Sequence, residues 1–274
     1  MAVENVAWDG ATGVWALSTN WKQLNGTAAG HYPGEDAEAD VCFMDGRSSL
    51  NITGWVYGSI LGNPIGGLTV SEDFRGSLGT QDLPLTFDDA DNGTLTYSGQ
   101  GSEAWLLGVF ATVNVLATGS GDDALHLSTE TAYTLMNILS GKVTLDSQLN
   151  GQTNPSAGVV TLTIGNGPNV LDPVVTIAAP VTTVLNLYQG TVYWNSGTIT
   201  QLNQYGGNFL CSRSVTSRTL TNASIYGGNC DLRTGYAGAS GGSTRTIVLT
   251  NPIKQYGGEP IKTDPGMTLQ TATI

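Results

Sequence analysis

The chain has 274 residues, 37 of them glycine, and its 22 acidic and 10 basic side chains give a net charge of −12, yet only 12% of its residues are charged. This negative balance argues against partners that require a basic surface, so neither nucleic acid nor an anionic membrane is expected as a partner. The low charge content also excludes an intrinsically disordered chain, which would be highly charged and poor in β-branched residues.

The beginning of the chain is rich in tryptophan. The first fifty residues contain Trp8, Trp15 and Trp21, followed by "HYPGEDAEADVCFMDG" with Tyr32. No basic segment followed by an apolar one occurs here, so we expect no secretory signal and therefore synthesis in the cytoplasm. We predict that residues 1–65 form an N-terminal cap together with the first coil of a repetitive fold.

This cap is also a candidate docking region. A surface that docks onto another protein is less charged and more aromatic than the remaining surface. We therefore predict that the docking contacts are Trp8, Trp15, Trp21 and Tyr32. In the alternative interpretation, the tryptophans are entirely used in covering the first coil, because the end of a solenoid must be capped to stay soluble.

From residue 66 onward, the sequence predicts strands and no helices. Short stretches rich in Val, Ile, Leu, Thr and Tyr end in Gly, Asn or Ser, as in "GTLTYSG" and "GVVTLTIGNG". No long apolar stripe with helical spacing occurs. The longest apolar run, 104–117, is interrupted by Asn114 and is too short to cross a membrane, so it is expected to form buried strands.

One central segment is similar to a calcium-binding repeat. "ATGSGDDALHL", residues 117–127, nearly matches the glycine-rich nonapeptide of calcium-binding β-helices, with Asp122 and Asp123 as candidate ligands. Such repeats share each ion between successive turns, and this chain has no tandem copy. We therefore predict neither a metal site nor a cofactor, and Asp122 and Asp123 are the only metal candidates.

The sequence predicts no catalytic residue. His31 and His126 are far apart and neither lies near a G-x-S-x-G motif, so a catalytic triad is not expected. Glu130, Asp146 and Asp172, with the two aspartates above, could face one another across a groove as in glycoside hydrolases. Acidic residues of this chain lie mostly at turns, however, where aspartate caps the backbone.

The C-terminal part repeats an aromatic-glycine turn. "LYQGTV", "QYGGNF", "IYGGNC" and "QYGGEPI" contain Tyr188, Tyr205, Tyr226 and Tyr256, which are 17, 21 and 30 positions apart. An imperfect period near twenty residues is typical of a β-helix, whose coils tolerate turns of different length. We predict a single-chain, right-handed parallel β-helix over residues 66–274, with glycine supplying a positive φ at each corner.

Two cysteines are expected on adjacent coils of this β-helix. Cys211 and Cys230 are about one repeat apart, and the chain has three cysteines in all. An odd number argues against a disulfide framework. Both alternatives stay open, a pair of buried thiols or a single disulfide.

Aromatic residues of the same coils form a second candidate site. They are Tyr188, Tyr193, Trp194, Tyr205 and Tyr226. Their rings could stack on sugars if they were exposed along one face. A ladder of aromatic residues more often fills a core or a turn, so this contact with carbohydrate is an alternative interpretation.

Residues 7–80 resemble the opening of a family of structural proteins from tailed phages. "WDGATGVWALSTNW", "HYPGEDAEADVCF" and "GGLTVSEDFRGSLGT" are similar to a W-x-G…NW…PG-x-x-D…F opening with a following glycine-rich coil. In those proteins, the opening precedes a parallel β-helix. Some bacterial surface passenger proteins share the opening, but they carry secretion signals.

The resemblance implies a non-enzymatic structural protein of a tailed-phage virion. Among virion roles we predict a capsid decoration protein on the particle surface, synthesised in the bacterial cytoplasm. The expected partner is the major capsid protein or another virion protein, and the chain is expected to form a homo-oligomer, a trimer being one option. The alternative is a compact tail fibre or tailspike-like β-helix that binds or cleaves a host polysaccharide.

Overall fold

The structure of the chain is a computed structural model. The residues that the structure describes lie in the following ranges: 4–10, 12–35, 39–48, 50–52, 63–87, 93–101, 103–108, 110–119, 125–128, 132–145, 158–168, 170–178, 181–211, 218–233, 247–263 and 271–273.

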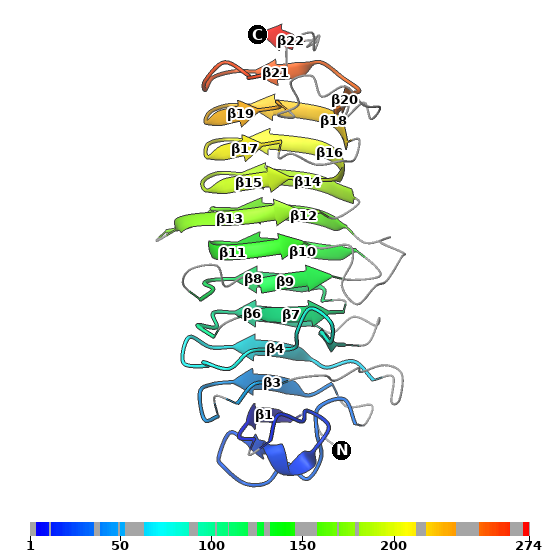
Figure 1. Ribbon diagram of the computed structural model, residues 1–274, viewed down its shortest axis with the longest axis vertical. Coiled ribbons are helices and arrows are strands. Elements are labelled where there is room, and N and C mark those ends of the chain that lie inside the picture. Colours follow the sequence, from blue (N-terminus) through cyan, green and yellow to red (C-terminus); the bar gives the residue numbers. More distant parts are fainter. Residues whose placement is uncertain are drawn as a thin grey trace.

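The strands form two long sheets whose members alternate along the chain from β4 to β20 (Figure 1). The first sheet contains β1 (Asn5–Trp8), β2 (Trp21–Gln23), β3 (Val41–Met44), β4 (Gly67–Val70), β6 (Thr94–Tyr97), β8 (Thr112–Val115), β10 (Tyr133–Ile138), β12 (Val159–Ile164), β14 (Val181–Leu187), β16 (Gly197–Gln204), β18 (Arg218–Ile225), β20 (Ile247–Leu249), β21 (Ile253–Gln255) and β22 (Thr271–Thr273). The second sheet contains β5 (Leu85–Thr86), β7 (Ala104–Leu107), β9 (Leu125–Ser128), β11 (Ser140–Leu145), β13 (Leu171–Ile177), β15 (Thr191–Trp194), β17 (Asn208–Leu210) and β19 (Asn229–Asp231).

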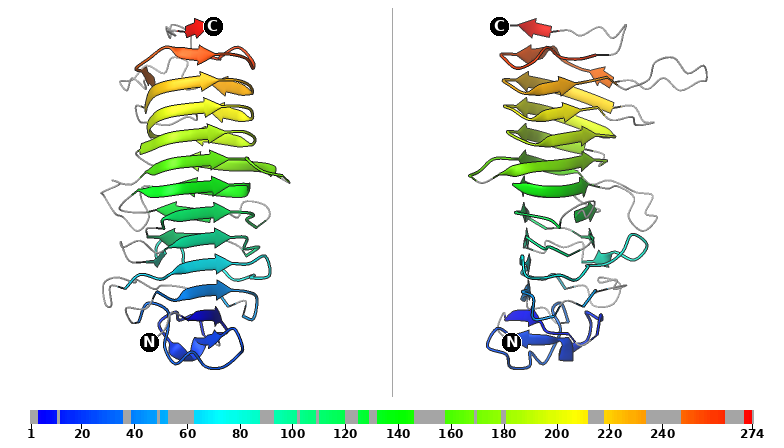
Figure 2. Two further views of the ribbon diagram at one scale, coloured as in Figure 1. Left: turned by 180° about the vertical axis from the view of Figure 1, so that it is seen from behind. Right: turned by 60° about the vertical axis from the view of Figure 1, so that its left-hand side comes forward.

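Parallel pairing between successive coils builds both sheets, and the pair of β1 and β2 at the N-terminal end is antiparallel. In the middle of the chain, β10, β12, β14, β16 and β18 pair in that order, and β11, β13, β15 and β17 do the same in the second sheet. Each strand thus lies beside the equivalent strand of the preceding coil, and the coils stack along one axis (Figure 2). This arrangement confirms the predicted parallel β-helix.

Buried side chains form continuous ladders between the sheets. In the first sheet, one ladder runs through Leu68, Leu95, Val113, Met136, Leu162, Leu185 and Leu202. In the second sheet, the ladder runs through Ala104, Leu125, Val143, Val175, Val192, Phe209 and Cys230. Because parallel strands are in register, each apolar side chain packs on its equivalent one coil away, and burial of these ladders stabilises the stack.

Glycine makes the tight corners at which the first sheet passes into the second. Gly190, Gly207, Gly228 and Gly258 have φ values of 95°, 67°, 81° and 87°, a left-handed conformation that other residues rarely adopt. A Cβ atom at Gly228 would lie 2.3 Å from the carbonyl oxygen of Gly207 in the preceding coil. The predicted role of glycine in these turns is confirmed.

The unequal spacing of the corners arises at the opposite connection of each coil. The segments between the strands of the second sheet and the next strands of the first are 195–196, 211–217 and 232–246 in three successive coils. The tight corners themselves keep one length and lie above one another at the left of Figure 1. The intervals of 17, 21 and 30 residues therefore reflect connections of different length in a regular stack.

Helical structure is minimal in the described ranges. The one helical segment found there is η1 (Ser18–Asn20), a short 3-10 turn before β2. No helix in the part of the chain that the structure describes is long and apolar enough to cross a membrane. The sequence predicts a boundary between the cap and the β-helix at residue 65. The first sheet is continuous across it, because β3 pairs with β4, and the boundary stays a prediction.

Candidate functional site

The three N-terminal tryptophans form a buried aromatic cluster. Trp15 and Trp21 have ring centroids 4.6 Å apart and Trp8 lies 5.3 Å from Trp21, both in edge-to-face geometry. The indole N–H of Trp21 donates to the carbonyl of Trp15 at 2.9 Å, and that of Trp15 donates to the carbonyl of Pro33 at 3.2 Å. All three side chains have 0% exposure. Their rings cover the first coil, as the alternative interpretation had it, and none of them offers a contact to a partner.

Tyr32 lies at the edge of this cluster. Its side chain is half-buried and packs against the apolar core, and its backbone N–H donates to the Glu35 carboxylate at 3.1 Å. Partial burial and the neighbouring Glu35 carboxylate raise the pKa of its phenol. Of the four predicted docking residues, Tyr32 alone keeps accessible surface.

The cap exposes aliphatic residues that the sequence prediction missed. Val14, Leu17, Leu24 and Leu50 are exposed by 49%, 38%, 46% and 42%. Scattered apolar side chains are common on protein surfaces. Other exposed aliphatic residues, such as Leu83, Val160 and Leu171, lie along the stack, so these four are the ones that the cap contributes. The sequence prediction missed them because it selected aromatic residues, the three tryptophans and Tyr32, as docking contacts.

Hydrogen bonds to the buried Asp40 carboxylate fix the segment after Tyr32 to the first strands. The carboxylate of Asp40 is fully buried, its Oδ2 lies 2.9 Å from Nε2 of His31, and its Oδ1 accepts the backbone N–H of Glu4 at 3.0 Å. A buried carboxylate needs such partners to offset its desolvation. His31 therefore has a structural partner.

Four tyrosines stack at the tight corners and form a tyrosine ladder, defined as Tyr188, Tyr205, Tyr226 and Tyr256. Successive ring centroids are 4.6, 5.0 and 4.8 Å apart with interplanar angles of 14°, 6° and 6°. Each ring is exposed by 37–46%. Partial burial and the neighbouring phenols of Tyr188 and Tyr226 raise the pKa of Tyr205.

The geometry of the tyrosine ladder does not suit stacking on sugars. A sugar packs on the open face of an aromatic ring, but the faces of Tyr205 and Tyr226 are covered on both sides by neighbouring rings. What they present to solvent is ring edges and hydroxyl groups. Of the other predicted sugar contacts, Tyr193 lies on β15 of the second sheet and is 39% exposed, whereas Trp194 is fully buried. The prediction for Trp194 is therefore wrong.

Trp194 belongs instead to a buried cation–aromatic contact. The guanidinium carbon of Arg218 lies 5.6 Å from the centroid of the indole ring, and its Nη1 donates to the carbonyl of Trp194. Arg218 is 1% exposed at the start of β18. This arginine thus supports the core at the corner opposite the tyrosine ladder.

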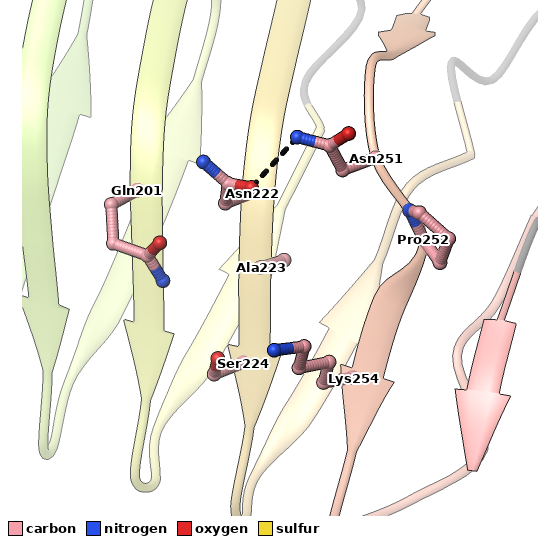
Figure 3. Close-up of a pocket in the computed structure, with 7 residues that line it drawn as sticks. All are labelled: Gln201, Asn222, Ala223, Ser224, Asn251, Pro252 and Lys254. Carbon is pink, nitrogen blue, oxygen red and sulfur yellow. Dashed lines mark hydrogen bonds between the residues drawn. The ribbon is translucent and has the colours of Figure 1, made fainter.

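A polar groove opens on the outer face of the first sheet, between β18 and β21 (Figure 3). It has a volume of about 340 Å³. Its lining residues, which define the polar groove, are Gln201, Asn222, Ala223, Ser224, Asn251, Pro252 and Lys254.

A change of register produces the polar groove. Leu220 pairs with Leu249 and Ser224 pairs with Lys254, so the segment from β20 to β21 has one residue more than the part of β18 that it faces. This extra residue makes a β-bulge at Asn251–Pro252, and proline has no N–H to donate to the ladder. The strands therefore separate beside Asn222. No sequence pattern indicates this opening, because the shift becomes evident only when the two strands are aligned.

The acidic candidates give no site in the described part of the chain. Asp122, Asp123, Glu130 and Asp146 lie outside the described residues, and the Asp172 carboxylate accepts a hydrogen bond from Gln189 at 2.8 Å. Among the residues that the structure describes, no group of three or more His, Cys, Asp or Glu side chains could hold a metal ion.

Both cysteines of the C-terminal coils are buried thiols. Burial, followed by the neighbouring Cys211 and Asp231, raises the pKa of Cys230. Of the two alternatives for Cys211 and Cys230, the structure has the pair of buried thiols and not the disulfide.

Comparison with known proteins adds no relative: no protein-family model, no curated protein and no solved structure matches the chain.

Proposed function

We propose that the chain is a non-enzymatic structural protein of a tailed-phage virion, most simply a capsid decoration protein. The proposal rests first on the resemblance of residues 7–80 to the opening of phage β-helical proteins. The observation that carries it is the shape of the molecule, a single stack of coils whose N-terminal end is closed by an aromatic cluster. Such a rod suits display on a particle.

The outer surface of the cap is the proposed attachment site. Interface centres are poor in charge and rich in apolar side chains, and Val14, Leu17, Leu24 and Leu50 provide such side chains at this end. The buried tryptophans would act indirectly by holding the segments that carry these residues. The proposed partner is the major capsid protein, and attachment as a homo-oligomer, including a trimer, belongs to the same proposal.

Point variants test this proposal better than truncation. Removing residues 1–30 would delete all three tryptophans of the cluster and uncover the apolar core. The double variant Leu17→Asp/Leu24→Asp instead adds charge to the exposed cap surface. Leu171→Asp is the matched control, because Leu171 is 76% exposed on β13, far along the stack.

The experiment incubates each purified protein with undecorated capsids of the source phage and measures co-sedimentation. We expect the wild type and Leu171→Asp to bind and Leu17→Asp/Leu24→Asp to lose at least tenfold in affinity with an unchanged melting temperature. Equal binding by the double variant would place the attachment surface elsewhere. If the wild type binds no capsid, the decoration role itself is wrong.

A further inference from the structure

The polar groove has hydrogen-bonding groups that the protein leaves unused. Asn222 is engaged at both ends, since its Nδ2 donates to the carbonyl of Thr200 at 3.2 Å and its Oδ1 accepts from Asn251 Nδ2 at 2.9 Å (Figure 3). This contact orients the Asn251 amide and leaves its Oδ1 as an acceptor. Gln201 likewise uses its Nε2, which donates to Asn203 Oδ1 at 2.8 Å, and keeps its Oε1.

Lys254 brings a positive charge to the polar groove. Its side chain extends toward β18 and ends near Ser224 (Figure 3). Within the described ranges, the Lys254 ammonium forms no hydrogen bond or ion pair, whereas Lys22 and Lys262 each pair with a carboxylate. No acidic residue lines the polar groove, although the chain as a whole has a net charge of −12.

From these contacts we infer that the polar groove binds a sugar that carries a carboxylate, namely a hexuronic acid unit of an acidic polysaccharide. The two amide oxygens and the Ser224 hydroxyl match the hydroxyl groups of a sugar ring, and the ammonium of Lys254 matches its carboxylate. Pro252, which is exposed, adds apolar surface for the C–H face of the ring. This inference does not rest on the proposed virion role.

Size and charge favour this ligand over other anions. The volume of about 340 Å³ is at the lower end of the range of about 300–1,000 Å³ that is typical of small-molecule sites, which fits one or two sugar rings. A phosphate group is usually held by several cations or by the fork of an arginine, and one lysine provides neither. A neutral sugar would leave the ammonium without its counter-charge.

The test uses the full-length, 15N-labelled chain and two-dimensional NMR at constant ionic strength. D-glucuronate, D-glucose and acetate are titrated separately. We expect saturable shifts of the amide signals of Ser224, Asn251 and Lys254 with glucuronate, and shifts at least fivefold smaller with glucose and acetate at equal concentration. Glucose tests the need for the carboxylate, and acetate tests the need for the ring.

Two lysine variants complete the design. Lys254→Gln should weaken glucuronate binding about tenfold, because a neutral donor replaces a charge-assisted one. Lys22→Gln makes the same change of charge at the opposite end of the molecule and should leave the affinity unchanged. Lys254 is exposed, so its variant is expected to keep the wild-type melting temperature.

Several results would overturn the inference. These are an absence of saturable binding, equal responses to acetate or to glucose, shifts located away from the polar groove, and a Lys254→Gln variant that binds glucuronate as tightly as the wild type.

Discussion

Trp21 lies at the centre of the N-terminal cluster, in contact with both Trp8 and Trp15. Truncating a buried tryptophan removes a large apolar area and leaves a cavity, which costs about 3–5 kcal/mol of unfolding free energy. We therefore expect Trp21→Ala to lower the urea midpoint strongly, as followed by circular dichroism. Leu24→Ala, at an exposed position directly after β2, is the control and should stay within about 0.5 kcal/mol of the wild type. Similar small effects of both variants would show that the cluster does not stabilise the cap.

The buried thiols lead to a second prediction at the scale of single residues. Burial raises the pKa of Cys42 well above its ordinary value, and the nearby Asp40 raises it further; Cys230 is raised in the same direction, also mainly by burial. The reactive species of cysteine is the thiolate, which both effects disfavour. In the native protein at neutral pH, we expect Cys42 and Cys230 to resist Ellman's reagent for hours.

The same reagent provides the controls for this prediction. All three cysteines should react within minutes in denaturant, and an added Leu171→Cys, at an exposed position, should react rapidly in the native protein. Rapid native reaction of Cys42 or Cys230 would contradict their burial.

At the scale of the turn, a comparison of two glycines distinguishes the cost of a left-handed backbone from the cost of a steric clash with the neighbouring coil. Gly26 and Gly228 have similar φ values of 89° and 81°, but a Cβ at Gly26 would meet nothing within 4 Å, whereas one at Gly228 would meet the Gly207 carbonyl. Gly26→Ala should cost about 1–2 kcal/mol for the left-handed conformation alone. Gly228→Ala should cost about 1–3 kcal/mol more, because the backbone of the neighbouring coil must move. Equal costs, measured by urea unfolding, would mean that coil spacing at the corner is not tight.

In the tyrosine ladder, we expect the contribution of each tyrosine to stability to depend on how many rings it stacks on. Tyr226 stacks on two rings, and Tyr188 stacks on one among the described residues. An aromatic pair contributes about 0.5–1.5 kcal/mol beyond burial of area, so Tyr226→Ala should cost about twice as much as Tyr188→Ala. Tyr226→Phe keeps both contacts and should be nearly neutral. A loss of stability in the phenylalanine variant would instead indicate that the hydroxyl is essential.

The elements differ in how far the sequence could predict them. The strands and tight corners follow from local rules: β-branched residues favour strands, and a repeated Tyr-Gly-Gly marks a turn with positive φ. The candidate sites depend on the pairing of distant segments. Trp194 faces the core because it pairs with the buried Ile177 of the preceding coil. The strands separate at Asn251–Pro252 because Ser224 pairs with Lys254. A single extra residue between β20 and β21 is enough to change the result.

The whole molecule has a net charge of −12, and the described part contains few ion pairs. Repulsion among like charges destabilises the compact state, and salt reduces it by shortening the Debye length from about 30 Å at 0.01 M to about 8 Å at 0.15 M. We therefore expect the melting temperature to rise by a few degrees between 0.01 and 0.15 M NaCl. In domains slightly smaller than this chain, each kcal/mol of added stability raises the melting temperature by about 2–4 °C. Sodium and potassium chloride should act equally. A falling melting temperature would show that attractive ion pairs outweigh the net repulsion.

The fixed tight corner and the variable opposite connection have a consequence for how such a chain can evolve. Each coil of the tyrosine ladder is aligned by its own tyrosine and glycine, so residues gained or lost between 210 and 218, or between 231 and 247, change the length of that coil without displacing any strand of the next. The coils therefore stack at a regular spacing even though the number of residues per coil varies. The opposite connections can acquire new segments under separate selection, and they are the natural positions for grafting a foreign peptide onto the molecule.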